Sequence, residues 1–243
     1  MPPLQLGRLN RRVYLADRRR IKNRRGHKSF RLKQSSRKFI SLPPIRHMNL
    51  RQEFLRIFYP SLIRLSQLTG RRRRILRNAN HKLPLVPIYD FEIELNSGER
   101  FSLSAARGKK ILFVNTASNC GYTRQYEQLQ SLFEANNDRL TVIGFPANDF
   151  KEQEKGSDSE IASFCKVNFG VNFPLAKKSS VIKGPSQNNI FKWLSHPDQN
   201  GWCNQEPTWN FSKYLVDEQG VLLDYFDPAV SPLDEEVLSA IRD

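Results

Sequence analysis

The sequence predicts a mixed α/β fold, with a central sheet that has parallel strands in its core and an antiparallel edge. Two short apolar runs, residues 111–114 (ILFV) and 140–145 (LTVIGF), are typical of strands buried on both faces. Apolar residues at helical spacing follow each run, at 122–133 and at 158–169. Strands that alternate with helices pair in parallel, which predicts the core of the sheet.

Two hairpins and two further helices complete the expected domain. Residues 89–95 and 100–103 alternate apolar and polar side chains on either side of a turn at Gly98. A second hairpin is expected over 211–216 and 221–226, with helices over 189–194 and 231–241.

The positive charge is concentrated at the N-terminal end of the chain. The first 82 residues carry 24 Lys and Arg against two acids, a net charge of +22, and the other 161 residues carry −7. The overall charge of +15 therefore describes a basic extension joined to a mildly acidic domain, and it does not by itself indicate nucleic-acid binding.

Residues 1–47 are expected to be a disordered basic extension, because they have no sustained apolar period with which to bury surface. A nucleic-acid-binding tail is one interpretation of this stretch. Translation that starts at Met48, which would leave the stretch without a function, is at least as good an interpretation. We expect no nucleic-acid partner.

Residues 48–76 are expected to form a basic amphipathic helix, with apolar side chains on one face and a cluster of arginines at 71–74. Such a helix fits a peripheral contact with an anionic membrane surface, and packing of its apolar face on the domain explains it equally well. Residues 77–87 contain two prolines and are expected to be a linker, so that the folded domain covers 88–243.

Cys120 lies where the first buried strand is followed by a helix. The small and polar residues from Asn115 to Gly121 end the apolar run, and the helical period starts at Tyr122. Unpaired N–H groups and the positive end of the helix dipole favour a thiolate at such a position. A buried core cysteine is the alternative, but the polar neighbours argue against burial. We therefore expect a reactive Cys120.

The three cysteines of the chain contain no C-x-x-C pair and are too few for a disulfide framework. This usage fits a reducing compartment and disfavours a zinc site, so we expect a cytoplasmic protein without a metal, with peripheral membrane contact left open. A copper-delivery protein is also disfavoured, because Cys120 has no second cysteine within four residues.

Three segments together resemble the glutathione peroxidase family, which has a thioredoxin-like fold with a central mixed sheet flanked by helices. They are NTASNCGYT at 115–123, FPANDFKEQE at 145–154 and WNFSKYL at 209–215. The similarity covers residues 86–243 and none of the N-terminal extension. Three such motifs in order make a specific match.

The resemblance implies a peroxidase that uses cysteine in place of selenium. Cys120 matches the reactive position, so its thiolate would attack a hydroperoxide and be left as a sulfenic acid. Gln153, Trp209 and Asn210 match residues whose N–H groups lie beside the reactive sulfur. Their roles follow from the resemblance alone, and the implied chemistry needs neither a metal nor an organic cofactor.

Cys165 matches the resolving cysteine of thioredoxin-dependent members of the family. It would attack the sulfenic acid to form a disulfide, which thioredoxin would reduce. Its place on the apolar face of its helix fits a packed core thiol as well. Because a disulfide needs Cα atoms within about 7 Å, we expect that helix to unwind locally during turnover. Cys203 is expected to be a bystander.

Two other functions stay open. Glutathione would be the better reductant if turnover did not need Cys165, and a non-enzymatic sensor would relay oxidation from Cys120 to a partner protein. Hydrogen peroxide and organic hydroperoxides are equally compatible substrates. The short segment from Ser195 to Pro207 lacks the long insertion of tetrameric relatives, so we expect a monomer or dimer.

Overall fold

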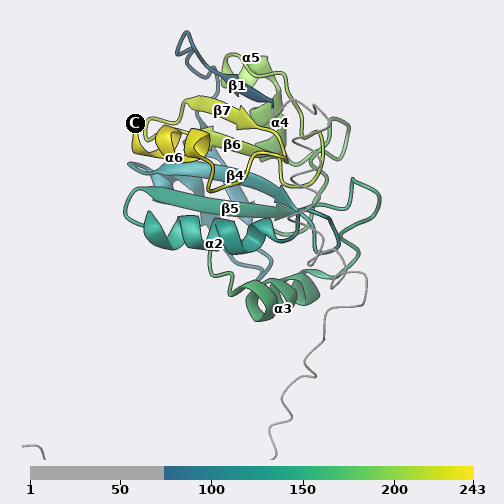
Figure 1. Ribbon diagram of the computed structural model, residues 1–243. Helices are drawn as coiled ribbons and strands as arrows, with labels where there is room; N and C mark the ends of the chain where they lie inside the picture. Colours follow the sequence, from purple (N-terminus) through teal and green to yellow (C-terminus); the bar gives the residue numbers. More distant parts are fainter. Residues whose placement is uncertain (1–73) are drawn as a thin grey trace, which may run out of the picture. The chain divides into compact units, whose positions relative to one another are not determined.

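The computed structural model describes residues 74–243. The extension predicted for 1–47 and nearly all of the helix predicted for 48–76 lie outside these residues. Figure 1 shows a central sheet with helices packed against it. Within 74–243, no helix has the length and apolar character needed to cross a bilayer.

Five strands form the central sheet, in the order β1-β7-β6-β4-β5 (Figure 1). β4 (Lys110–Thr116) and β5 (Leu140–Pro146) pair in parallel. All other neighbours in this sheet pair antiparallel. The remaining strands are β1 (Ile75–Arg77), β6 (Lys213–Val216) and β7 (Leu222–Phe226). The predicted mixed sheet is therefore confirmed, but its parallel pair lies at the β5 end and the centre of the sheet is antiparallel, because β6 of the C-terminal hairpin pairs with β4.

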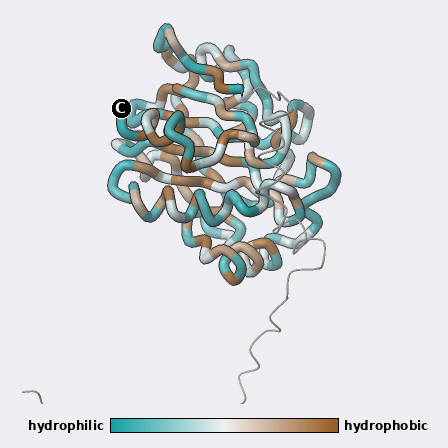
Figure 2. Tube along the Cα trace, in the orientation of Figure 1, coloured by the Kyte–Doolittle hydropathy of each residue, from teal (hydrophilic) through white to brown (hydrophobic). Residues whose placement is uncertain are grey.

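The sheet separates two hydrophobic cores, because successive side chains of a strand point to opposite faces. Ile111 and Phe113 of β4 contribute to the core that contains α4, whereas Leu112 and Val114 contribute to the core that contains α2, α3 and α6. Figure 2 shows hydrophobic residues concentrated on the central strands. The helices are α2 (Gln125–Ala135), α3 (Asp158–Phe169), α4 (Asn189–Ser195), α5 (Pro197–Asn200) and α6 (Glu235–Arg242).

A separate hairpin covers the core on the α4 side. β2 (Glu92–Glu94) and β3 (Arg100–Ser102) pair antiparallel, as the alternating pattern predicts. The first strand is shorter than predicted, because its leading residues form the 3-10 turn η1 (Ile88–Asp90). A second such turn, η2 (Leu103–Ala106), follows the hairpin.

The sheet begins earlier in the chain than the sequence predicts. Residues 75–77 are predicted to end a helix and start a linker, but they form strand β1, whose Ile75 lies opposite Phe226 of β7. Three residues carry too little pattern to predict a strand, and the exposed edge of β7 supplies the pairing that makes one. The predicted boundary at Ile88 is therefore too late.

Candidate active site

Cys120 lies in a series of turns between β4 and α2. Residues 118–124 form these turns, and α2 begins at Gln125. Thr123 holds the turn, since its Oγ1 accepts the Cys120 N–H at 3.0 Å and donates to the Ala117 carbonyl at 2.8 Å. The predicted junction is confirmed, but the helix starts three residues later than predicted.

Hydrogen-bond donors from two distant parts of the chain meet at the Cys120 sulfur. The Tyr122 N–H lies 3.4 Å from Sγ and points toward it. The backbone of Gly121 and the side chains of Trp209 and Asn210 also interact with the thiol as hydrogen-bond partners. The N–H groups near the sulfur thus come from a turn and from the third motif, and not from the first turn of α2.

Burial outweighs these donors in the resting protein. Cys120 is only 3% exposed and belongs to the core between the sheet and α2. Burial raises the pKa of the Cys120 thiol above its usual value, while the Tyr122 N–H, Trp209 and Asn210 lower it. The sequence-based expectations of an unburied sulfur and of a favoured thiolate are therefore wrong, because the surrounding core keeps water away from the sulfur.

Gln153 reaches the same cluster through Asn210. The Asn210 side-chain amide donates to Gln153 Oε1 at 2.9 Å, and the Asn119 N–H donates to the Gln153 carbonyl at 3.1 Å. Gln153 and Trp209 are both partly exposed, whereas Cys120 and Asn210 are buried. The fold therefore brings together all three of the side chains expected beside Cys120, at a place where solvent reaches two of them.

Asn115, near the end of β4, holds the third motif against the first. Its side-chain amide donates to the Trp209 carbonyl at 3.1 Å, and its Oδ1 accepts the Ser212 N–H at 2.9 Å. The Phe211 N–H donates to the Asn115 carbonyl at 2.6 Å. A buried asparagine with all of these partners fixes the backbone on both sides of Asn210.

Cys165 lies on the buried face of α3, in the same core as Cys120. Burial raises the pKa of the Cys165 thiol to about 12, the Tyr126 hydroxyl of α2 lowers it, and the charge of Glu154 raises it. All three cysteines are free thiols. Cys165 is therefore a neutral, enclosed thiol in this state.

Glu154 is a buried acid that sequence reasoning did not select. It is 1% exposed, and its Oε2 accepts the Ser118 hydroxyl at 3.0 Å. Burial raises its pKa to about 7, which Ser118 and the charge of Lys178 partly offset. In the sequence, Glu154 sits in a charged run beside the exposed Glu152, and composition alone does not distinguish the two.

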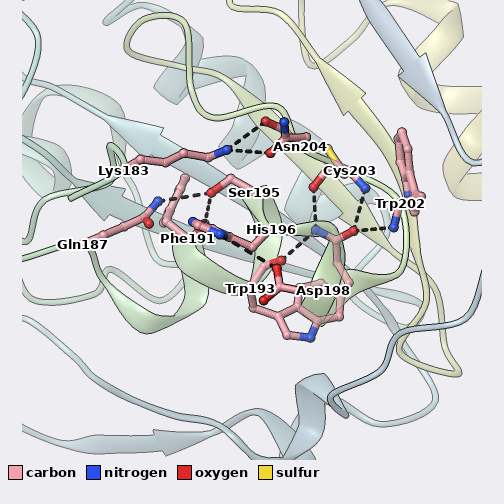
Figure 3. A network of polar contacts seen from close by, with 11 residues as sticks. Lys183, Gln187, Phe191, Trp193, Ser195, His196, Asp198, Trp202, Cys203 and Asn204 are labelled. Atoms are coloured by element: carbon pink, nitrogen blue, oxygen red, sulfur yellow. Dashed lines mark hydrogen bonds and ion pairs between the residues drawn. The ribbon is translucent and has the colours of Figure 1, made fainter. Parts of the chain in front are cut away.

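Cys203 lies in the opposite core, with α4. Its N–H and carbonyl both bond to the side chain of the buried Asn200, at 2.6 and 2.9 Å, within the network of Figure 3. Burial raises the pKa of the Cys203 thiol to about 11. The sheet thus separates Cys203 from Cys120 and Cys165. In the described part of the chain, no group of three or more His, Cys, Asp or Glu could hold a metal ion.

Comparison with known proteins identifies the family. A family model described as glutathione peroxidase matches residues 88–195. The glutathione peroxidase homolog BsaA of Staphylococcus aureus (strain MW2) is 45% identical over 150 residues, which are 61% of this chain and 94% of that protein. The chain belongs to the glutathione peroxidase family. As a member, it is an oxidoreductase of the peroxidase class.

Other known proteins are similar to the chain in sequence or in fold. The glutathione peroxidase-like peroxiredoxin 2 of Saccharomyces cerevisiae is 37% identical over 156 residues, covering 63% of this chain and 96% of that protein. The crystal structure of Trgpx in apo form matches with a TM-score of 0.50 and 30% identity, over 65% of this chain and 97% of that one. A DsbF homologue from Corynebacterium diphtheriae shares the fold at a TM-score of 0.50 and 17% identity, over 70% of this chain and 94% of its own. The thioredoxin-like fold implied by the three motifs is confirmed.

Proposed function

We propose that this member of the glutathione peroxidase family reduces hydrogen peroxide or organic hydroperoxides through a sulfenic acid on Cys120. The observation that carries the proposal is the meeting of donors from Tyr122, Trp209 and Asn210 at one sulfur atom. Donors fixed around an atom stabilise the negative charge that develops there during reaction. Gln153 supports this arrangement by accepting a hydrogen bond from Asn210.

In the proposed first step, the Cys120 sulfur attacks one oxygen of the hydroperoxide and the O–O bond breaks. A sulfur lone pair forms the new S–O bond, and the electrons of the O–O bond leave with the second oxygen. That oxygen takes up the thiol proton and departs as water or an alcohol. Because burial keeps the proton on the resting thiol, the donors act as the charge appears.

In the second step, Cys165 attacks the sulfenic acid, water leaves, and a disulfide forms that thioredoxin reduces by exchange. Cys165 must leave its buried position for this. The limited burial of α3 supports such a movement, because only Ile161 and Cys165 are buried among its twelve residues, with Phe164 and Phe169 partly buried against the same core. Helices with little buried apolar surface open locally at a low cost in free energy.

Direct reduction by glutathione is the second candidate, and the complete burial of Cys165 favours it. A Cys165→Ser variant that keeps full turnover with glutathione would make it the better assignment. A stoichiometric sensor is distinguished by steady NADPH consumption with thioredoxin, thioredoxin reductase and peroxide, which only an enzyme sustains. We also expect a monomer or a dimer in solution, which native mass measurement reports.

The deciding experiment is the intact mass after one equivalent of hydrogen peroxide, with peptide mapping. Loss of two hydrogens located to Cys120 and Cys165 is the expected result, and Cys203→Ser is the matched control that should change nothing. Oxygen adducts that accumulate on Cys120 would remove Cys165 from the cycle. If peroxide leaves Cys120 unmodified, the proposed function is wrong.

A further inference from the structure

The Glu154 carboxyl is attached to the turn that carries Cys120. Its Oε2 accepts the Ser118 hydroxyl at 3.0 Å, and its backbone N–H donates to Asn148 Oδ1 at 2.9 Å. Burial of a carboxylate is costly unless the group is bonded, and a buried acid in a cleft of reactive groups is a candidate for proton chemistry. The first bond ties the carboxyl to Ser118, two residues before Cys120 in the chain, and the second fixes the backbone of Glu154.

The charge of the same carboxyl is felt at the resolving cysteine. The charge of Glu154 acts on the Cys165 thiol and on the Tyr126 hydroxyl, and it disfavours ionisation of both. The positive group that acts on Glu154 is Lys178, whose ammonium donates to the Gly156 carbonyl. The carboxyl is therefore bonded to the turn that carries Cys120, where the disulfide must form, and its charge also reaches the Cys165 thiol, which shares a core with Cys120.

We infer that Glu154 accepts the proton of the Cys165 thiol while the Cys165 sulfur attacks the Cys120 sulfenic acid. This inference rests on the proposed function. The new S–S bond forms from a Cys165 lone pair, and the S–O bond of the sulfenic acid breaks with its electrons on oxygen. Glu154 passes the proton to that departing hydroxide, which leaves as water, so the carboxylate is regenerated and no outside reactant is needed.

The protonation behaviour of the two groups suits this transfer. A thiol with a pKa of about 12 does not ionise by itself near neutral pH, whereas an acid with a pKa of about 7 is present as both acid and carboxylate there. A group that titrates near the working pH can both take up and release a proton. Glu154 also precedes Ser157, the N-cap of α3, so its bond to Ser118 can persist while α3 unwinds around Cys165.

A purely electrostatic role for Glu154 predicts the opposite sign. Its negative charge disfavours a Cys165 thiolate, so a neutral replacement would ease ionisation and speed the second step. A proton acceptor, by contrast, slows that step when it is lost. The direction of the change in Glu154→Gln therefore separates the two roles, and it does so in a variant that keeps an acceptor oxygen for Ser118.

The test follows a single turnover with one equivalent of hydrogen peroxide, quenched at intervals, alkylated and measured by mass spectrometry. In Glu154→Gln we expect Cys120 oxidation to be unchanged, and formation of the Cys120–Cys165 disulfide to slow by about a hundredfold. The wild-type rate of disulfide formation should rise with pH through a midpoint near 7, and this rise should vanish in the variant. Glu152→Gln, an exposed acid in the same loop, is the matched control and should keep both the rate and the profile.

Two results would overturn the inference alone: a Glu154→Gln disulfide rate equal to or above wild type, or a pH profile that survives the substitution. Should Glu154→Gln fail to fold, Glu154→Asp provides the measurement. This variant retains a carboxylate, so its rate of disulfide formation should still change with pH through a midpoint. A rate that does not change with pH in Glu154→Asp would contradict the role of Glu154 as proton acceptor. If the wild-type protein forms no sulfenic acid or no disulfide, the proposed function fails and takes this inference with it.

Discussion

The two sides of the sheet differ in how tightly their helices are held. α3, which carries Cys165, has twelve residues, of which two are buried. α4 has seven residues, of which five are buried, and it packs in the core that contains Cys203. Buried apolar area is the main source of local stability. The thiol expected to move therefore sits on the loosely held helix, and the bystander thiol sits beside the firmly held one.

Buried polar groups are also more completely hydrogen-bonded on the Cys203 side of the sheet than on the Cys120 side. Asn200, beside Cys203, has both of its side-chain polar atoms bonded, in contacts of 2.6 to 2.9 Å. Among the described residues, five buried side-chain atoms lack a hydrogen bond, and four of them belong to the Cys120 side: Thr116 Oγ1, Asn119 Oδ1, Tyr126 Oη and Asn210 Oδ1. The Tyr126 and Thr116 hydroxyls do interact, but without normal hydrogen-bond geometry. Incomplete pairing is concentrated where the proposed chemistry takes place.

The largest expected effect on stability is on the Cys203 side. Asn200→Ala would leave the carbonyls of Trp193 and Cys203 and the N–H groups of Trp202 and Cys203 without their partner. We expect the free energy of unfolding to fall by about 3 to 5 kcal/mol, because buried groups lose their bonds. Guanidinium titration measures this.

The exposed Asn204, which binds Lys183, is the matched control for that substitution. Asn204→Ala should cost less than about 1 kcal/mol. An equal cost for the two variants would mean that the Asn200 network is not what holds this side of the molecule together.

The next effect is a pH dependence of stability that belongs to Glu154. Its pKa in the folded protein is raised to about 7 from an ordinary 4.5, so the folded state keeps a proton that the unfolded state has already lost. The free energy of unfolding therefore falls by about 3 kcal/mol as the pH rises from 4.5 to 7. Above pH 7 it is level.

Glu154→Gln should remove this fall. Asp224, whose pKa is raised to about 6 by burial, contributes a similar fall in both proteins, so only the difference between wild type and variant reports Glu154. Unfolding by guanidinium at several pH values measures it. Parallel curves for the two proteins would show that Glu154 is not buried as an acid in solution.

Local patterns were enough to predict strands β4 to β7 and helices α2, α3, α4 and α6, but not the short edge strand β1 or the burial of the site. The run at 111–114 predicts a buried strand because a strand enclosed on both faces has no polar position. The polar neighbours of Cys120 suggest exposure, yet Asn119 pairs with the Gln153 carbonyl and Ser118 with Glu154. Such long-range pairing replaces water, and one sequence does not reveal it. The burial of Glu154 also depends on such long-range pairing, so the sequence does not reveal it.

A smaller effect should appear in hydrogen exchange. Since α3 buries two residues and α4 buries five, opening of α3 should cost less free energy than opening of α4. We expect amides of α3 to exchange at least about tenfold faster than those of α4, a difference of about 1.4 kcal/mol. Exchange followed by mass spectrometry of the reduced protein measures both helices in one sample. Equal protection would remove the physical basis for unwinding of α3.

The smallest expected effect concerns backbone strain next to Gln153. Lys151 and Glu152 have φ angles of 52° and 51°, a left-handed conformation that glycine adopts more easily than residues with a Cβ. Glu152→Gly relieves this strain but adds freedom to the unfolded chain and removes an exposed ion pair with Lys155, so the net gain is modest. We expect the Tm to rise by about 2 °C. Glu152→Gln, which loses the same ion pair and keeps the Cβ, separates the two contributions and should leave the Tm unchanged or slightly lower. A fall in Tm for the glycine variant beyond that of Glu152→Gln would show that this loop is not strained. The two sides of the sheet would then differ in packing and in hydrogen bonding, but not in backbone strain.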